Sequence, residues 1–224
     1  MIEMNFETAR HNMIEQQIRP WNVIDPVALD ALEAIPRENY VAENMKSSAF
    51  SDVELPIGHN QVMLFPKIEA KILQTVQLQK TDNVLEIGTG SGYMTALLAH
   101  LAEKVCSVEI HDDLSLQAQE KLGADGFDNI SFIVANATEE SEQQITQHGP
   151  FDVIILTGSV PQLPDIFKQM LKTGGRLFAV IGTAPAMEAT LITQVSDSQY
   201  ANEILFETSI PELENMPQAE GFEL

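Results

Sequence analysis

The chain has 224 residues, 44% hydrophobic and 6% aromatic, a composition typical of a globular protein with a substantial core. Its 33 acidic and 12 basic residues give a formal net charge of −21, which argues against binding to nucleic-acid phosphates. No run approaches the ~20 apolar residues of a membrane span, and Met1 to Gln17 lack the apolar segment of a signal peptide. The single cysteine, Cys106, excludes a disulfide within the chain, and we expect a cytoplasmic protein. The five histidines lack metal-ligand spacing, so no metal site is predicted.

Residues 1–80 are expected to form an N-terminal extension that is mainly helical. Apolar residues recur at helical spacing, and prolines interrupt the pattern. Asp25 is the predicted N-cap of a helix whose first residue is Pro26. The predicted helices of this extension cover residues 5–18, 26–35 and 67–76, with an irregular segment at 37–54.

A hydrophobic loop, residues 55–66, lies at the end of this extension. It combines apolar residues with Pro56, Gly58 and Pro66, and it precedes a helix. Because exposed loops are usually polar, we expect this segment to fold against a ligand cleft.

From Thr81 onward, short apolar runs alternate with helical patterns, which indicates a largely parallel sheet covered on both faces. The predicted strands are 83–87, 104–109, 130–134, 151–156 and 175–181, followed by a hairpin of 189–195 and 203–209. The predicted helices are 91–101, 113–123, about 138–147, and 162–171. Residues 81–211 form the predicted core, and the acidic tail at 212–224 is expected to be loosely held.

The segment Asn83 to Tyr93 carries the strongest functional pattern. An apolar strand leads into Glu86-x-Gly88-x-Gly90-x-Gly92 and then a helix, the opening of a nucleotide-binding βαβ unit. A dinucleotide fingerprint requires a third glycine where Tyr93 stands. We expect Glu86 to repel a pyrophosphate but to tolerate the ammonium and sulfonium of S-adenosylmethionine. A glycine-rich turn that binds nothing is the alternative interpretation.

A second acid supports the same interpretation. Glu109 ends the next predicted strand, 17 residues after Gly92. This spacing is close to that at which an acid binds the ribose hydroxyls of a nucleotide.

With these residues together, the chain resembles the protein-L-isoaspartate O-methyltransferase family from about Arg10 to about Pro211. The resemblance is carried by the glycine turn and by five further segments: 13–19 (MIEQQIR), 35–41 (IPRENYV), 55–58 (LPIG), 151–155 (FDVII) and 174–177 (GGRL). It implies a Rossmann-like, seven-stranded methyltransferase fold with a mostly parallel sheet and an antiparallel C-terminal hairpin. It also implies S-adenosylmethionine as cofactor and methyl transfer to a carboxylate of damaged polypeptide.

The resemblance assigns cofactor-binding roles residue by residue. The turn would surround the methionine moiety, Glu109 the ribose, and Ile110 and Asn136 the adenine. The predicted cofactor-binding residues are Gln61, Val62, Met63, Glu86, Gly88, Thr89, Gly90, Ser91, Gly92, Glu109, Ile110, Asn136 and Ala137. The catalytic residue is not assigned; Gln61, His59 and Thr157 are candidates, and Ser159 is another hydroxyl at the same predicted edge.

Two departures from the family pattern concern the site. Val62-Met63-Leu64 replaces the family's Thr-Ile-Ser, so both hydroxyls are missing, and Asn136 replaces an Asp. These departures leave three hypotheses open: methylation of damaged polypeptide, methylation of a small apolar metabolite on the same fold, and a non-catalytic cofactor-binding module. The acceptor and the oligomeric state are not predicted.

Overall fold

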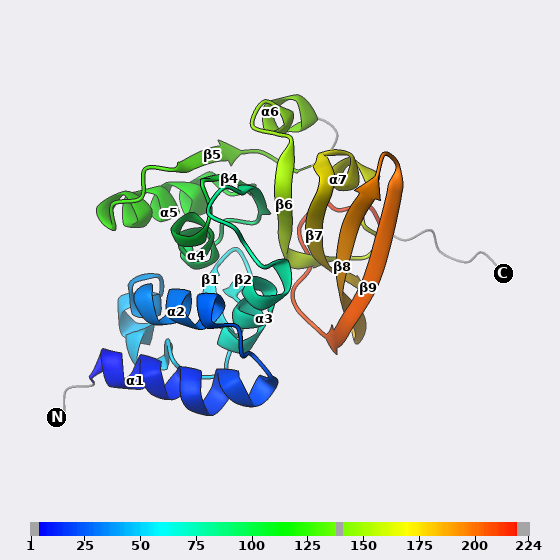
Figure 1. Ribbon diagram of the computed structural model, residues 1–224. Helices are drawn as coiled ribbons and strands as arrows, with labels where there is room; N and C mark the ends of the chain where they lie inside the picture. Colours follow the sequence, from blue (N-terminus) through cyan, green and yellow to red (C-terminus); the bar gives the residue numbers. More distant parts are fainter. Residues whose placement is uncertain (1–4, 138–140, 219–224) are drawn as a thin grey trace.

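The protein is described by a computed structural model that covers residues 5–137 and 141–218. Its centre is a seven-stranded sheet in the order β5-β4-β3-β6-β7-β8-β9 (Figure 1). Strands β3 to β7 pair in parallel, whereas β8 pairs antiparallel with both β7 and β9. The strands are β3 (Asn83–Ile87), β4 (Lys104–Glu109), β5 (Ile130–Val134), β6 (Phe151–Val160), β7 (Leu171–Thr183), β8 (Ala186–Ser196) and β9 (Gln199–Thr208). The predicted fold class, including the antiparallel C-terminal hairpin, is confirmed.

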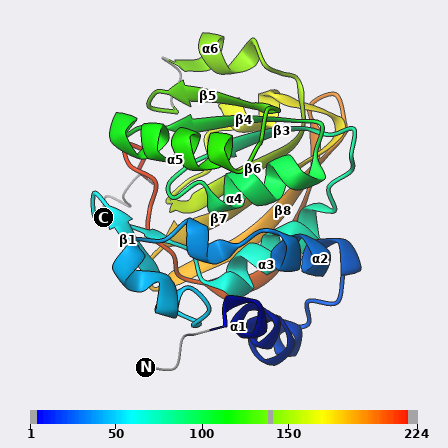
Figure 2. The same cartoon turned by 90° about the vertical axis from the view of Figure 1, so that its left-hand side faces the viewer.

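Strand β3 shows why the sheet is buried on both faces. Val84 packs into a hydrophobic cluster with residues of α4 (Tyr93–Leu101) and α5 (Asp112–Ala124), whereas Leu85 packs into a second cluster with residues of α6 (Glu142–Thr146) and α7 (Asp165–Gln169). Alternate side chains point to opposite faces of a strand, so an apolar residue is needed at almost every position. Figure 2 shows α4 and α5 in front of the sheet.

The N-terminal extension packs beside the same face as α4 (Figure 1). It contains α1 (Phe6–Met13), α2 (Pro26–Ala34) and α3 (Pro66–Val76). A π turn (Ile14–Ile18) and a 3-10 turn (Arg19–Trp21) extend α1. The Asp25 side chain caps α2 as predicted, because its Oδ2 accepts a 3.1 Å hydrogen bond from Ala28 N.

The segment predicted to be irregular, residues 37–54, contains the 3-10 turns Arg37–Asn39 and Glu43–Ser48. Arg37 is fully buried. It donates to Ala49 O (2.9 Å) and Leu64 O (2.7 Å) and forms an ion pair with Glu69 of α3. A single guanidinium therefore joins this segment, the start of α3 and the chain entering it.

Residues 55–66 differ from the predicted loop. They contain a small hairpin of β1 (Leu55–Gly58) and β2 (Gln61–Met63). The turn between the strands places His59 (φ 51°) and Asn60 (φ 58°) in the left-handed region. Two successive left-handed residues match the right-handed twist of a two-residue hairpin.

Other boundaries also differ from the predictions. Helix α7 starts at Asp165 and not at the predicted residue 162, because Pro164 disfavours helical geometry at the residue before it. Strand β6 continues to Val160, since Ser159 and Val160 pair with β7. Of the predicted helix 138–147, residues 142–146 are helical and residues 138–140 lie outside the described residues. No helix within residues 5–137 and 141–218 is long and apolar enough to cross a membrane.

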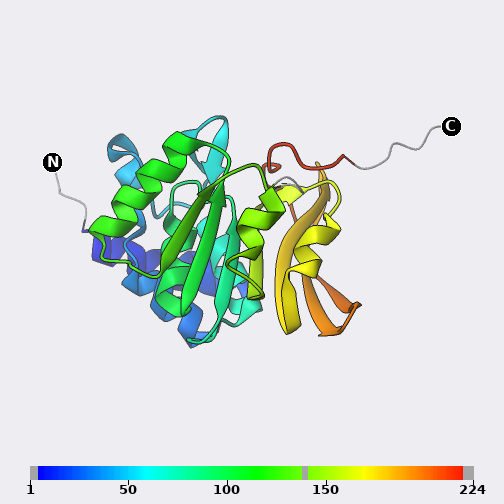
Figure 3. The same ribbon diagram turned by 90° about the horizontal axis from the view of Figure 1, so that it is seen from above.

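The expectation of a loosely held tail is wrong for residues 212–216. Leu213 N donates to Ser159 O (2.9 Å), Ser159 N donates to Pro211 O (2.8 Å), and the Met216 side chain is buried. Figure 3 shows this segment passing across one end of the sheet. Backbone hydrogen bonds to β6 hold it there.

Candidate cofactor and acceptor site

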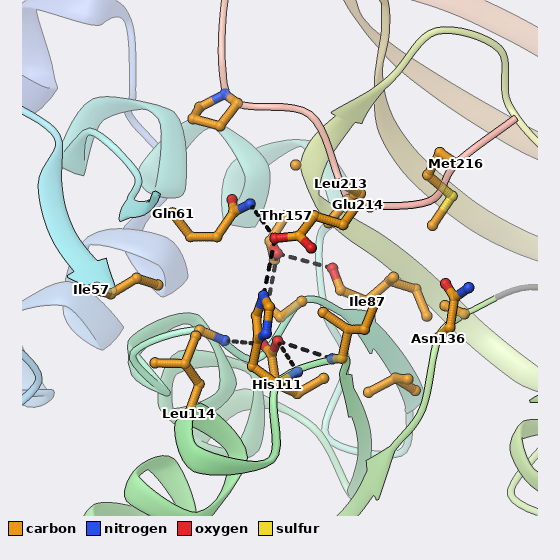
Figure 4. Close-up of a pocket in the computed structure, with 18 of the residues that line it drawn as sticks. Ile57, Gln61, Ile87, His111, Leu114, Asn136, Thr157, Leu213, Glu214 and Met216 are labelled. Carbon is orange, nitrogen blue, oxygen red and sulfur yellow. Dashed lines mark hydrogen bonds and ion pairs between the residues drawn. The ribbon is translucent and has the colours of Figure 1, made fainter. Parts of the chain in front are cut away.

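A pocket lies where β3, β4, β5 and β6 end (Figure 4). Strand order changes direction between β3 and β6, and ligands of open α/β sheets bind at such a point. Nine predicted site residues line this pocket: Gln61, Val62, Gly88, Gly90, Glu109, Ile110, Asn136, Ala137 and Thr157. Lining residues that were not predicted include Ile57, Leu64, His111, Pro211, Leu213, Glu214 and Met216.

The glycine turn needs glycine for two different reasons. Gly88 has φ 97°, and a Cβ there would overlap the Thr157 hydroxyl. That hydroxyl lies 2.9 Å from Ile87 O and 2.7 Å from Gly88 O, so it donates to the turn itself. Gly92 caps α4 at φ 86°, and a Cβ there would be 3.1 Å from Ala118 Cβ of α5. Gly88 thus shapes the pocket, and Gly92 lets α4 and α5 pack closely.

Glu86 lies behind the pocket and not among its lining residues. It is fully buried, and its Oε2 accepts 2.6 Å hydrogen bonds from Thr95 and Ser107. Burial raises the pKa of Glu86 to about 8, so the neutral acid predominates at pH 7. The expected electrostatic selection by Glu86 at the pocket surface is therefore not what the structure shows.

Four other predicted cofactor residues also lie outside the lining. Met63 is buried in the core, Thr89 pairs with Ser107 Oγ at 2.6 Å, and Ser91 Oγ accepts from Tyr93 N at 3.3 Å. Gly92 is the fourth, for the packing reason given above. Thr89, Ser91 and Gly92 belong to the turn and its support, whereas Met63 belongs to the hydrophobic core. Sequence spacing alone does not separate such roles from ligand contact.

Glu109 is held in one orientation at the end of β4. It is 5% exposed; its Oε2 accepts from Gly90 N (2.8 Å), and its Oε1 accepts from Ile110 N (2.9 Å) and His111 N (3.1 Å). Each carboxylate oxygen has two lone pairs, so Oε2 retains capacity for one more donor. A ribose hydroxyl at the pocket fits that capacity.

Asn136 provides the second polar group of the pocket. Its Oδ1 is buried and has no hydrogen-bond partner among the described residues. Buried acceptors without a donor are rare in folded proteins. The amino group of an adenine would supply the missing donor, so the residues present fit the cofactor that the sequence predicts.

The hydroxyl and histidine candidates occupy different places. His59 does not line the pocket; its exposed ring lies 2.9 Å from Asp113 Oδ1 and stacks on His111 with ring centroids 3.8 Å apart. The hydrogen bond to Asp113 raises the pKa of His59. Ser159 is fully buried and donates to Ile210 O (3.0 Å). Gln61 and Thr157 are the catalytic candidates that reach the pocket.

The sheet order, the glycine turn and the polar ends of β4 and β5 define a Rossmann-like methyltransferase. Residues 8–209 match the family model described as protein-L-isoaspartate(D-aspartate) O-methyltransferase (PCMT). The chain belongs to this family, and the predicted family resemblance is confirmed.

Individual relatives agree with the family match. Protein-L-isoaspartate O-methyltransferase 1 of Syntrophobacter fumaroxidans is 38% identical over 189 residues, 84% of this chain and 86% of that protein. The protein-L-isoaspartate O-methyltransferase of Xanthomonas campestris pv. campestris is 33% identical over 216 residues, 96% of this chain and 93% of that protein. A Plasmodium falciparum chain assigned to the same activity, in complex with S-adenosyl-L-homocysteine, is similar in fold. Its TM-score is 0.79 at 22% identity, over 95% of this chain and 99% of that chain.

Proposed function

We propose that the chain transfers a methyl group from S-adenosylmethionine to a carboxylate of damaged polypeptide, the isoaspartyl group named in its family. One observation supports this most directly. The pocket at the sheet edge presents both a fixed carboxylate, Glu109, and a buried acceptor, Asn136 Oδ1, without a partner among the described residues. Their chemistry matches the ribose and the adenine amino group of that cofactor.

The remaining cofactor contacts come from the glycine turn, whose Gly88 and Gly90 line the pocket beside Thr157. When bound, the cofactor supplies a methyl group on a positively charged sulfur. An acceptor carboxylate is already ionised at neutral pH and requires no general base. The chain's task is therefore to align the carboxylate and to exclude water. Ile57, Val62 and Leu64 serve the second purpose, because they give this wall of the pocket an apolar surface.

The direct test is incubation of the purified protein with methyl-labelled S-adenosylmethionine and an isoaspartyl peptide. The same peptide with an ordinary aspartyl residue is the matched control. We expect base-labile methyl ester only on the isoaspartyl peptide. Ester formation no higher than in a reaction without protein contradicts the proposal.

A second candidate function is methylation of a small apolar metabolite. It is supported by Val62 and Leu64, which line the pocket where the family resemblance places hydroxyl groups. An apolar wall suits an aliphatic or flat acceptor. Thermal-shift measurements in the presence of S-adenosylhomocysteine separate the two functions. Stabilisation by apolar acceptors and none by the isoaspartyl peptide favours the metabolite.

We also infer a cytoplasmic location. The single, buried Cys106 supports it, since a reducing compartment requires no disulfide framework. Comparing the protein in cytosolic and envelope fractions tests this inference.

A further inference from the structure

The segment Pro211–Met216, here named the C-terminal strap, borders the cofactor pocket. Its residues Pro211, Leu213, Glu214 and Met216 all line that pocket. Backbone hydrogen bonds to Ser159 fix its course, and Met216 is buried at its end. The strap therefore presents its side chains to the pocket from a defined position.

Glu214 is the charged side chain that the strap places at the pocket. Its Oε1 accepts hydrogen bonds from His111 Nε2 (3.0 Å) and Gln61 Nε2 (3.2 Å), as Figure 4 shows. The His111 hydrogen bond, followed by that of Gln61, lowers the pKa of Glu214, which keeps it ionised. A carboxylate is thus bound at the pocket by one imidazole and one amide.

Asn136, whose amide the proposed function assigns to the adenine, is one other side-chain donor at the pocket. The Thr157 hydroxyl donates to the glycine turn, and no lysine or arginine occurs among the described lining residues. The basic side chain among the described lining residues is therefore His111. Glu109 is also at the pocket and would repel a second carboxylate. An acceptor carboxylate entering here finds its best side-chain donors in Gln61 and His111.

His111 is held in place by two contacts, one of which is itself supported by Asp113. Its backbone N donates to Glu109, its ring stacks on His59, and Asp113 fixes the His59 ring. An imidazole oriented this way loses little conformational entropy when it binds a carboxylate.

We propose that Gln61 and His111 form the binding subsite for the acceptor carboxylate, and that Glu214 occupies this subsite as an internal substitute when no acceptor is bound. The inference rests on the proposed function, because it assumes a carboxylate acceptor. The acceptor carboxylate then displaces the Glu214 carboxylate when it binds, so Glu214 competes with the acceptor for the subsite.

The test uses the full chain and four variants: Glu214→Gln, His111→Ala, the double variant, and Glu212→Gln as matched control. Glu212 belongs to the same strap, but its carboxylate accepts from Gln218 and does not face the pocket subsite. The readouts are KM and kcat for the isoaspartyl peptide at saturating S-adenosylmethionine, and the peptide Kd in the presence of S-adenosylhomocysteine.

Removing the internal carboxylate should favour the acceptor. We expect Glu214→Gln to lower the peptide KM and Kd about two- to fivefold, the scale of one exposed ion pair. His111→Ala should raise them about three- to tenfold, the scale of one typical hydrogen bond. The benefit of Glu214→Gln should shrink in the His111→Ala background, and Glu212→Gln should resemble the native chain.

The outcomes separate this inference from the proposed function. If the native chain binds and methylates the peptide but Glu214→Gln matches Glu212→Gln, the subsite is wrong and the function stands. If the native chain neither binds the peptide in the presence of S-adenosylhomocysteine nor methylates it with S-adenosylmethionine, both fail. Should His111→Ala not fold, Glu214→Gln and His111→Gln, which keeps an N–H donor, decide the question.

Discussion

Replacement of Gly88 by alanine tests how the turn shapes the pocket. Gly88 has φ 97°, and an alanine there costs about 1–3 kcal/mol in backbone strain. The new Cβ would also overlap the Thr157 hydroxyl and displace it from Ile87 O and Gly88 O. Losing that interaction costs about 1 kcal/mol, so we expect the free energy of unfolding to fall by about 2–4 kcal/mol.

Urea unfolding followed by circular dichroism measures this loss. Gly123→Ala is the matched control, because Gly123 lies in α5 and a Cβ there meets no atom within 4 Å. Alanine at 123 should stabilise the chain by about 0.5–1 kcal/mol or leave it unchanged. Calorimetry on the folded Gly88→Ala protein should show S-adenosylhomocysteine binding weakened by about tenfold or more.

A double-mutant cycle separates the two costs. Thr157→Ala in the Gly88→Ala background removes the overlap but leaves the strained φ. The double variant should therefore be more stable than the sum of the single losses predicts, by about 1 kcal/mol. A Gly88→Ala protein with the native urea midpoint and native cofactor affinity refutes this account of the turn.

Three further predictions follow from the site and its support. Asn136→Ala should weaken S-adenosylhomocysteine binding about 5- to 150-fold, a loss of about 1–3 kcal/mol. Asn136→Asp keeps an acceptor, and its affinity should stay within tenfold of that of the native chain. Equal calorimetric affinities for all three proteins contradict the adenine contact. Arg37→Met leaves Glu69 buried without its ion-pair partner and should lower the free energy of unfolding in urea by about 3–5 kcal/mol. Arg19→Met breaks an exposed ion pair and should lower it by about 0–1 kcal/mol. Similar losses for both variants would show that burial is not the cause. Because burial raises the pKa of Glu86 from 4.5 to about 8, its stabilising contribution is fully present below pH 4.5 and declines as pH rises toward 8, by up to about 1.4 kcal/mol per pH unit. Glu86→Gln should remove that part of the decline between pH 5 and 8, and parallel stability curves for the two proteins would exclude it.

Much of the site was predictable because its signals are local. The order of strand, glycine turn, helix and acid identified Gly88, Gly90 and Glu109, and family resemblance added Asn136, all of which line the pocket. The same reasoning grouped Glu86 with them, since a pattern of spacing does not tell which face of a strand a side chain occupies within a covered sheet. The structure places Glu86 between Thr95 and Ser107, beneath the turn.

The strap shows the opposite case. An acidic, proline-containing C-terminal segment is typical of a loosely held tail, and no periodicity indicates that Leu213 or Glu214 lines a pocket. The position of His111 in the sequence likewise gives no indication that it belongs to a site. His111 and Glu214 are recognisable as site residues only because they contact each other, although they lie 103 residues apart in the sequence.

The amino-acid sequence by itself determined the layered α/β fold, the family and the cofactor class, because strand and helix periodicity and the glycine turn depend on neighbours close along the chain. The tertiary structure alone decided which polar groups face the pocket, why Arg37 is buried, and where the strap lies. Those facts depend on contacts between distant segments, and such contacts are set by how the whole sheet and its helices pack.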